Sequence, residues 1–353
     1  MNPISQSSPM RLCLVLALLV WVGSAPGLAQ QQTLVGEQTT KVSDHVWAIM
    51  GFPNIGIVVG TRAALAVDTG MGPKNGATVA KVAARLSKSS KLFLTTTHFH
   101  PEHAAGESGF PAETILIRNA VQQREMVLHG QEIIDQFRSR SAQNADLLAG
   151  ATLRTPDIVF DTETTIDLGG VTAKLLWAGE GHTKGDLLVF VEPDGTLITG
   201  DLVQNKVVPG IAADGGTPSS WLAALDKLAT LNVRHVLPDH SPVGDGSLIA
   251  AERSFISDLR TRARAALPAM VKLLVGEYGA RRVVLFGSLL RDEPHPEPDL
   301  DLLVEGLDAA QLCEARGRLF LIAPVPVDLV PAETSRREIE ACARETGEVL
   351  HGT

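Results

Sequence analysis

The chain has 353 residues, of which 44% are hydrophobic and 20% are charged, as in ordinary globular proteins. That balance excludes disorder over most of the chain, and the length indicates about two domains. The net charge of -9, which no basic block offsets, argues against a nonspecific nucleic-acid binder.

Residues 1–29 are predicted to be a cleavable signal peptide and not part of the fold. Arg11 precedes an apolar run over 12–22, and Gly27-Leu28-Ala29 fits the small-x-small rule for cleavage before Gln30. The run is too short and too weakly flanked for a comfortable membrane span, and an uncleaved N-terminal anchor is the alternative. We therefore expect a periplasmic or secreted bacterial protein with no stable membrane span after cleavage.

Strands and helices alternate along the mature chain. The expected strands, rich in β-branched residues and bounded by turn residues, cover 46–50, 55–59, 64–67, 91–94, 115–117, 158–160, 171–176, 187–191, 197–199 and 233–237. The expected helices cover 74–87, 219–228 and a long polar stretch over 120–148, with Gly130 as a candidate break. Two successive halves of this kind favour two sheets packed face to face with helices outside.

The most informative segment is Thr97-His98-Phe99-His100-Pro101-Glu102-His103. It places three imidazoles and a carboxylate directly after an apolar strand. Zn²⁺ accepts both kinds of ligand, and a loop at the end of a buried strand can aim several side chains at one point. The alternative is a solvated histidine-rich loop. Further ligand candidates elsewhere in the chain argue against that alternative.

Those further candidates each lie just beyond a predicted strand: His182, Asp201 and His240. A lone histidine after a strand is more often a surface residue or a satisfied core residue than a ligand. Several histidines and carboxylates that share this placement instead predict one metal site.

The order of Asp68, His98-x-His100-x-Glu102-His103, His182, Asp201 and His240 resembles the metallo-β-lactamase fold superfamily, over roughly 30–260. The resemblance implies an αββα sandwich, assigned here to residues 30–261, with a metal pair in a cleft at one sheet edge. It implies that His98, His100 and His182 hold the first metal and that Glu102, His103 and His240 hold the second. Asp201 would bridge both metals, and Asp68 would orient the histidine-rich loop from behind the ligands.

The resemblance further implies a zinc-dependent hydrolase that uses a metal-activated water on a small ester, thioester, lactam or phosphoester. Asp201, Glu102 and Asp68 would be its catalytic carboxylates. An exported metallo-β-lactamase that hydrolyses β-lactams is the alternative. Asp201 counts against that alternative, because true β-lactamases usually have Cys or Ser at this position and glyoxalase II-type hydrolases have Asp.

Glu102 departs from the superfamily pattern, which usually has Asp there. The extra methylene moves the carboxylate outward by about one C–C bond, so the second metal could be weaker, displaced or absent. One or two zinc ions are therefore expected. A Glu102 that only forms a salt bridge at the cleft rim is the alternative. The His-Pro-Glu-His form resembles a subgroup whose substrates are mostly unassigned.

Residues 262–353 are predicted to form a second, smaller α/β domain. A strand over 282–286 leads to Gly287-Ser288, and two further strands carry Asp299, Asp301 and Asp328. Backbone N–H groups and a hydroxyl at a strand end can bind a triphosphate, and alternate carboxylates on one strand can share Mg²⁺. The alternative, in which Asp299 and Asp301 are simple edge-strand carboxylates, does not explain the Gly-Ser spacing.

This second pattern resembles the minimal nucleotidyltransferase domains of the polymerase-β-like superfamily, over roughly 268–353. The resemblance implies Mg²⁺, a nucleoside triphosphate, and a protein or small molecule as acceptor. Asp292, where Gly is usual after Arg291, and the prolines at 294, 296 and 298 depart from that pattern and weaken the case for activity.

The two halves favour different compartments, because nucleoside triphosphate is cytosolic whereas the leader directs export. In order of preference, the second domain is a degenerate passenger, or the chain is a chance gene fusion. The third possibility is that the leader fails and a cytosolic nucleotidyltransferase carries the main activity.

Overall fold

The computed structural model describes residues 34–208, 210, 215–287, 300–323 and 327–352. The predicted signal peptide, Ser288 and Asp299 lie outside the described residues. Within the described segments, no helix combines the length and the apolar character that crossing a bilayer requires.

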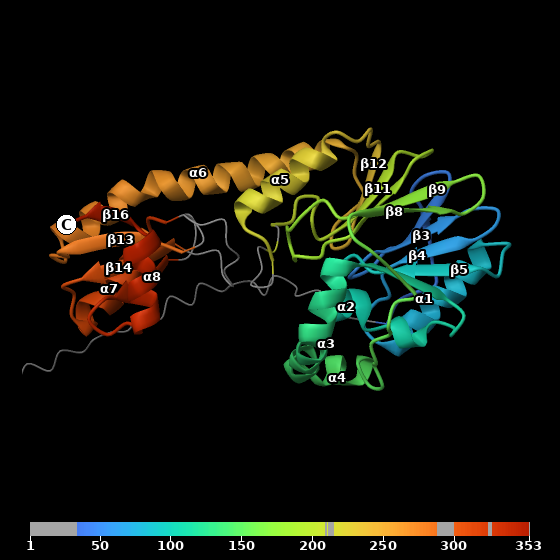
Figure 1. The fold of residues 1–353 in the computed structure, drawn as a ribbon, viewed down its shortest axis with the longest axis horizontal. Helices are drawn as coiled ribbons and strands as arrows, with labels where there is room; N and C mark the ends of the chain where they lie inside the picture. The colour runs from blue at the N-terminus through green and yellow to red at the C-terminus, as the bar shows by residue number, and fades with distance from the viewer. Residues whose placement is uncertain (1–33, 209, 211–214, 288–299, 324–326, 353) are drawn as a thin grey trace, which may run out of the picture. The chain divides into compact units, whose positions relative to one another are not determined.

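The first sheet has seven strands that pair in chain order. Part of this sheet is seen in blue and cyan in Figure 1. The strands are β1 (Thr40–Lys41), β2 (Val46–Ile49), β3 (Ile55–Val59), β4 (Ala64–Val67), β5 (Leu92–Thr95), β6 (Ile115–Asn119) and β7 (Ile158–Phe160). Strands β1 to β4 pair antiparallel, and β4 to β7 pair parallel. The parallel pairs need crossovers, which contain α1 (Pro73–Leu86), α2 (Pro101–Ala104) and α3 (Ala120–Arg140).

The second sheet has five strands in the order β12-β11-β10-β9-β8. These are β8 (Glu163–Asp167), β9 (Thr172–Leu176), β10 (Leu188–Val191), β11 (Thr196–Gly200) and β12 (His235–Pro238). Only β11 and β12 pair parallel, and the connection between them contains α5 (Pro218–Leu228). The carboxyl ends of β11 and β12 therefore lie at the same edge of this sheet.

Each strand turns alternate side chains to opposite faces. The side chains that face the other sheet form the core between the two sheets. On β4, Leu65 packs into the layer between the sheets, whereas Ala66 packs with α1 on the outer face. Leu175 and Ile198 bring the second sheet to the same inner layer. Helix α5 covers the outer face of the second sheet through the fully buried Trp221. The predicted αββα sandwich is confirmed.

The predicted break in the long polar helix at Gly130 is wrong. Gly130 is buried within α3, where an added Cβ would lie 2.6 Å from Leu153 Cδ1, so close packing explains this glycine. The helix ends instead at Arg140. The Ser141 hydroxyl then accepts from Asn144 N–H and caps α4 (Ala142–Leu147). Strands β1 and β8 were not predicted; β8 is a mostly exposed edge strand with little apolar signal.

The C-terminal region forms a third sheet, of four strands in the order β15-β14-β13-β16. These are β13 (Arg282–Phe286), β14 (Leu300–Glu305), β15 (Val327–Pro331) and β16 (Glu348–His351). Helices α6 (Ser247–Gly276) and α7 (Ala309–Leu319) pack on one face and α8 (Arg337–Thr346) on the other. Helix α6 is continuous through Pro268, and the predicted domain boundary after residue 261 falls within it.

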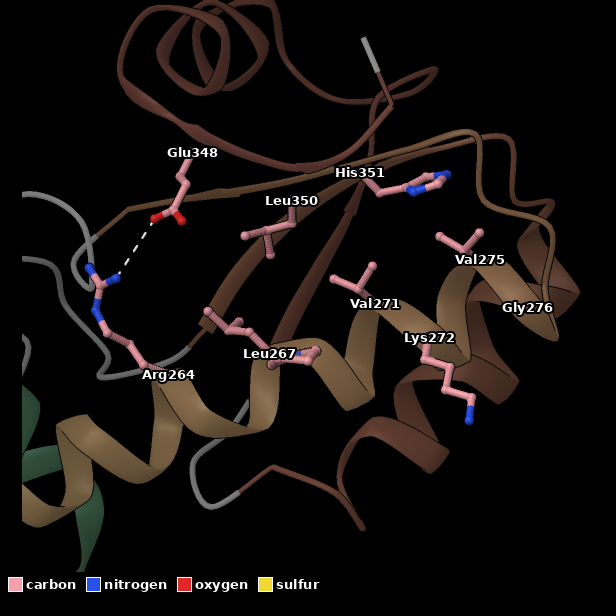
Figure 2. Close-up of a pocket in the computed structure, with 10 residues that line it drawn as sticks. Arg264, Leu267, Val271, Lys272, Val275, Gly276, Glu348, Leu350 and His351 are labelled. Atoms are coloured by element: carbon pink, nitrogen blue, oxygen red, sulfur yellow. Dashed lines mark ion pairs between the residues drawn. The ribbon is translucent and has the colours of Figure 1, made fainter.

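A groove of about 680 Å³ lies between α6 and β16 (Figure 2). Leu267, Val271 and Val275 from the helix and Leu350 from the strand give it an apolar floor. A salt bridge of 3.7 Å joins Arg264 to Glu348 beside that floor. None of the predicted metal or nucleotide residues that the structure describes lines this groove.

Candidate metal centre

The histidine-rich segment leaves the first sheet at the carboxyl end of β5. Pro101 occupies the first turn of α2, where its fixed φ suits a helix start and its missing N–H costs nothing. His98 and His100 therefore lie on the loop, and Glu102 and His103 lie on the short helix that follows. The strand and the proline together fix the backbone positions from which these four side chains project.

Asp68 lies directly after β4, the strand next to β5, and its backbone is left-handed, with φ of 73°. Its carboxylate is fully buried and accepts hydrogen bonds from Thr97 N–H at 2.6 Å and from the Thr97 hydroxyl at 2.9 Å. Asp68 thus fixes the start of the histidine-rich loop through these hydrogen bonds. The sequence predicted an orienting carboxylate at this position.

Three ring nitrogens from two distant segments converge on one point. His100 Nδ1 lies 3.0 Å from His98 Nε2 and 3.3 Å from His182 Nε2. His182 follows β9, and its Nδ1 lies 2.7 Å from the carbonyl oxygen of Gly210. Donation from Nδ1–H to that carbonyl leaves the Nε2 lone pair facing the other two rings.

A second set forms around His103 and His240, whose Nε2 atoms lie 3.2 Å apart. Ligand atoms of Glu102, His103 and His240 all lie within 4.8 Å of one another. Asp201, just past the end of β11, lies between the two sets. Its Oδ2 is 3.3 Å from His182 Nε2, and its Oδ1 is 3.2 Å from His240 Nε2.

This spacing fits zinc. Ligand atoms about 2.0–2.1 Å from a tetrahedral Zn²⁺ lie roughly 3.3 Å from one another, which matches the distances above. One potential ligand atom of the set, Glu102 Oε2, is buried and has no hydrogen-bond partner among the residues that the structure describes. No salt bridge of Glu102 to a described residue is present either, which argues against a merely electrostatic role at the rim.

The protonation states of His98 and Asp201 suit a cation. Burial lowers the pKa of His98 well below its usual value, and His103 and His100 lower it further, so the ring is neutral. Burial would raise the pKa of Asp201, but His182 and His240 outweigh burial and hold that pKa well below its usual range. Neutral imidazole and ionised carboxylate are the forms that coordinate metals.

Residues 48–240 match the sequence profile of the metallo-beta-lactamase superfamily. The chain belongs to this superfamily. Its members are usually hydrolytic enzymes, lactamases and sulfatases among them. A search of the curated proteins returned no significant match.

Solved structures of the superfamily are similar to this chain in fold. A metallo-beta-lactamase from Pontibacter korlensis shares 23% identity over 62% of this chain and 98% of its own, with a TM-score of 0.48. The stereoselective inverting sec-alkylsulfatase Pisa1 from Pseudomonas sp. shares 15% identity over 68% of this chain, with a TM-score of 0.52. This chain spans 45% of that alkylsulfatase. The DIM-1 metallo-beta-lactamase shares 15% identity over 63% of this chain and 97% of its own, with a TM-score of 0.49.

Two polar residues behind the superfamily cluster were not predicted, Asp239 and Thr97. Asp239 is fully buried, and its Oδ2 lies 3.1 Å from His103 Nδ1, the same distance as Asp68 Oδ2. The Thr97 hydroxyl lies 3.2 Å from that Asp239 oxygen and 3.2 Å from His98 Nδ1. The only sequence signal for Asp239 was its position next to His240 at a strand end.

The C-terminal sheet brings together three of the five predicted nucleotide-site residues. Gly287 has φ of 79°, and a Cβ there would lie 1.8 Å from Asp301 Oδ2, so the strand end and this carboxylate touch. Asp301 and Asp328 are register partners on the parallel strands β14 and β15. Asp301 is buried, whereas the side chain of Asp328 is 49% exposed and lies 3.5 Å from Arg316 Nη2.

Proposed function

We propose that this chain is a zinc-dependent hydrolase that acts on a small-molecule ester, thioester, lactam or phosphoester. The observation that carries the proposal is the position of Asp201, whose two oxygens each lie within 3.3 Å of a histidine from a different set. A carboxylate in this position can coordinate two cations at once. Two independent metal sites would not need a shared carboxylate between them.

The proposal assigns a role to each predicted ligand. His98, His100 and His182 would hold the first zinc ion; Glu102, His103 and His240 would hold the second; and Asp201 would serve both. Zinc ions in such a pair supply a water whose pKa falls toward about 7 and a Lewis acid for the negative charge that develops on the substrate.

The chain's own residues fix the tautomer of two of these ligands. Asp68 Oδ2 and Asp239 Oδ2 each lie 3.1 Å from His103 Nδ1. The proton that these carboxylates hold is the one on Nδ1, so Nε2 is the atom left to face His240. Gly210 fixes the tautomer of His182 in the same way.

Export to the periplasm or beyond is part of the proposal and rests on the leader sequence at 1–29. A β-lactam substrate remains the alternative. Asp201 weighs against it. The fold-level similarity to an alkylsulfatase adds sulfate esters to the substrate classes worth assaying.

Elemental analysis of the purified protein and a substrate panel would test the proposal. The panel is p-nitrophenyl acetate, a thioester, a chromogenic β-lactam, bis-p-nitrophenyl phosphate and p-nitrophenyl sulfate. We expect one or two zinc ions per chain, and hydrolysis that a chelator abolishes and zinc restores. Turnover that survives complete zinc removal would contradict the proposal, as would a zinc-loaded protein inert toward the whole panel.

A second candidate function, nucleotide transfer by the C-terminal sheet, is favoured by the contact between Gly287 and Asp301 and by the pairing of Asp301 with Asp328. In this proposal Ser288 and Asp299 would complete a site for Mg²⁺ and a nucleoside triphosphate, with a protein or small molecule as acceptor. Transfer of label from an α-labelled triphosphate, lost in Asp301→Asn and in Asp299→Ala but kept in the surface variant Glu314→Gln, would support it. No transfer with any of the four triphosphates would rule it out.

A further inference from the structure

A cavity of about 440 Å³, within the size range of small-molecule sites, lies beside the loops that carry His100 and His182. Phe99, which stands between two predicted ligands, lines it, and the Phe99 ring lies 5.1 Å from the His100 ring. Lys184 and Glu180 also line it, two residues to either side of His182. None of the seven predicted ligands lines the cavity, but close sequence neighbours of His100 and His182 do.

One face of α3 forms the opposite wall of this cavity. Val121, Arg124, Glu125 and Leu128 recur three and four residues apart, so their side chains lie on one face of the helix. Val121, Leu128 and Phe99 make part of the lining apolar. Leu128 is 70% exposed, whereas Phe99 is 3% exposed, so Leu128 supplies more of the accessible apolar surface than Phe99 does.

The loop that carries His182 and Lys184 is fastened to this helix. Glu125 accepts hydrogen bonds from Lys184 N–H at 3.1 Å and from Gly185 N–H at 2.9 Å, and Asn119 donates to the Gly185 carbonyl at 2.8 Å. A Cβ on Gly185 would lie 2.4 Å from Gln122 N, so only glycine permits this approach. The cavity wall and the metal ligand His182 are thus held by the same anchor.

The charges on the lining favour an anion. Arg124 and Lys184 are exposed cations, and neither forms a salt bridge with any residue that the structure describes. Burial and the nearby Asp186 raise the pKa of Glu125 to about 8, so this carboxyl is mostly protonated at neutral pH. Glu180 is then the one remaining negative side chain of the lining, against two unpaired cations.

We propose that this cavity binds the non-reacting end of the substrate, and that this end is an apolar body that carries an acidic group. The apolar body would lie against Phe99, Val121 and Leu128, and the acidic group would pair with Arg124 and Lys184. The inference rests on the proposed hydrolase function for the reaction itself, but the recognition of the anion can be measured without it.

The kinetic test compares two esters of equal length, p-nitrophenyl hexanoate and the mono-p-nitrophenyl ester of adipic acid. We expect a higher kcat/KM for the adipate ester, and about a 5–10-fold loss of this preference in Arg124→Gln and in Lys184→Gln. Arg124→Glu should reverse the preference. Arg140→Gln, on the exposed far end of α3, is the matched control and should leave both values unchanged. Equal use of the two esters by wild type and variants would overturn the inference while leaving the hydrolase intact.

The binding test uses zinc-free protein at pH 7, where Glu125 is mostly protonated, and titrates octanoate, with octanol as the uncharged comparison. We expect octanoate to bind more tightly than octanol, with the difference about 5–10-fold smaller in Arg124→Gln and Lys184→Gln than in wild type and Arg140→Gln. That result would support the cavity assignment even if no ester were hydrolysed. Octanoate binding that both variants retain in full would overturn it.

Discussion

The metal centre and the acidic cluster of the C-terminal sheet are built from the same kinds of residue but differ in how those residues are held. The predicted histidine ligands on the first domain are at most 8% exposed except for His240, and carboxylate, hydroxyl or carbonyl groups orient several of them. In the C-terminal sheet Asp301 is buried, whereas Asp328 is 49% exposed and paired with Arg316.

The difference teaches that strand-end acids do not by themselves make a cation site. A cation is attracted by charges that nothing else neutralises and that are already close together before it arrives. Asp201 has only histidines as ion-pair partners among the described residues, and they are potential ligands themselves. Asp328 already has an arginine. The predictions below test this contrast, from the largest expected effect to the smallest.

Asp201→Ala should lower hydrolysis by roughly 10³-fold, because loss of a group behind a ligand costs about 10–100-fold and loss of a shared ligand costs more. The zinc content of the purified variant should fall as well. Asp328→Asn is the matched change in the other cluster and should leave both quantities as in wild type. Equal losses in the two variants would abolish the contrast.

Glu252 on α6 is a buried carboxyl that is linked to Asp201 of the metal centre through Gln204. It accepts from Gln204 N–H, and Gln204 Nε2 donates to Asp201 Oδ1 at 3.0 Å. Burial raises the pKa of Glu252 to about 7 from 4.5. The unfolded chain therefore loses this proton first. The stabilisation is complete below about pH 4.5 and is lost as the pH rises through 7, by on the order of 2–3 kcal/mol.

Glu252→Gln should accordingly remove part of the pH dependence of stability. The measurement is the thermal midpoint of zinc-free wild type and variant at pH 5 and pH 8. The thermal midpoint of the wild type should fall further between pH 5 and pH 8 than the midpoint of the variant does. The idea fails if the two proteins lose the same amount.

Asp239→Asn tests the second carboxylate behind His103 and should weaken zinc binding by about 10–100-fold in competition with a chelator. Asp194 provides a matched control, since it is also buried and lies 2.7 Å from a histidine, His45 Nδ1, in another part of the sandwich. Asp194→Asn should cost stability and leave zinc affinity unchanged. An Asp239→Asn protein with wild-type zinc affinity would show that Asp68 alone holds His103.

Gly287→Ala should destabilise the C-terminal sheet by about 1–2 kcal/mol, because it places a Cβ at positive φ and against the Asp301 carboxylate. Gly317→Ala is the control within α7, where nothing lies within 4 Å of the added Cβ. That change should instead stabilise the helix by up to about 1 kcal/mol. Thermal unfolding of both variants makes the comparison, and equal midpoints would contradict it.

Much of the fold and of the metal centre could be predicted from the sequence. Strands such as Ile55–Val59 have strong β-rich signals, and the ligands follow strands in the order that the superfamily shares. Local patterns of this kind depend on a few neighbouring residues, so they can be seen in the chain itself. The exposed strand β8 and the uninterrupted helix at Gly130 could not be predicted, because packing with distant residues decides both.

By itself the sequence determined which donors this protein has and that they belong at strand ends. Only the tertiary structure decided that Asp239 shares His103 with Asp68, and that Arg124 and Lys184 line one cavity. The reason is physical: distance along a chain sets which way a strand or helix turns a side chain, but contacts between segments far apart in the sequence form only when the sheets and helices pack.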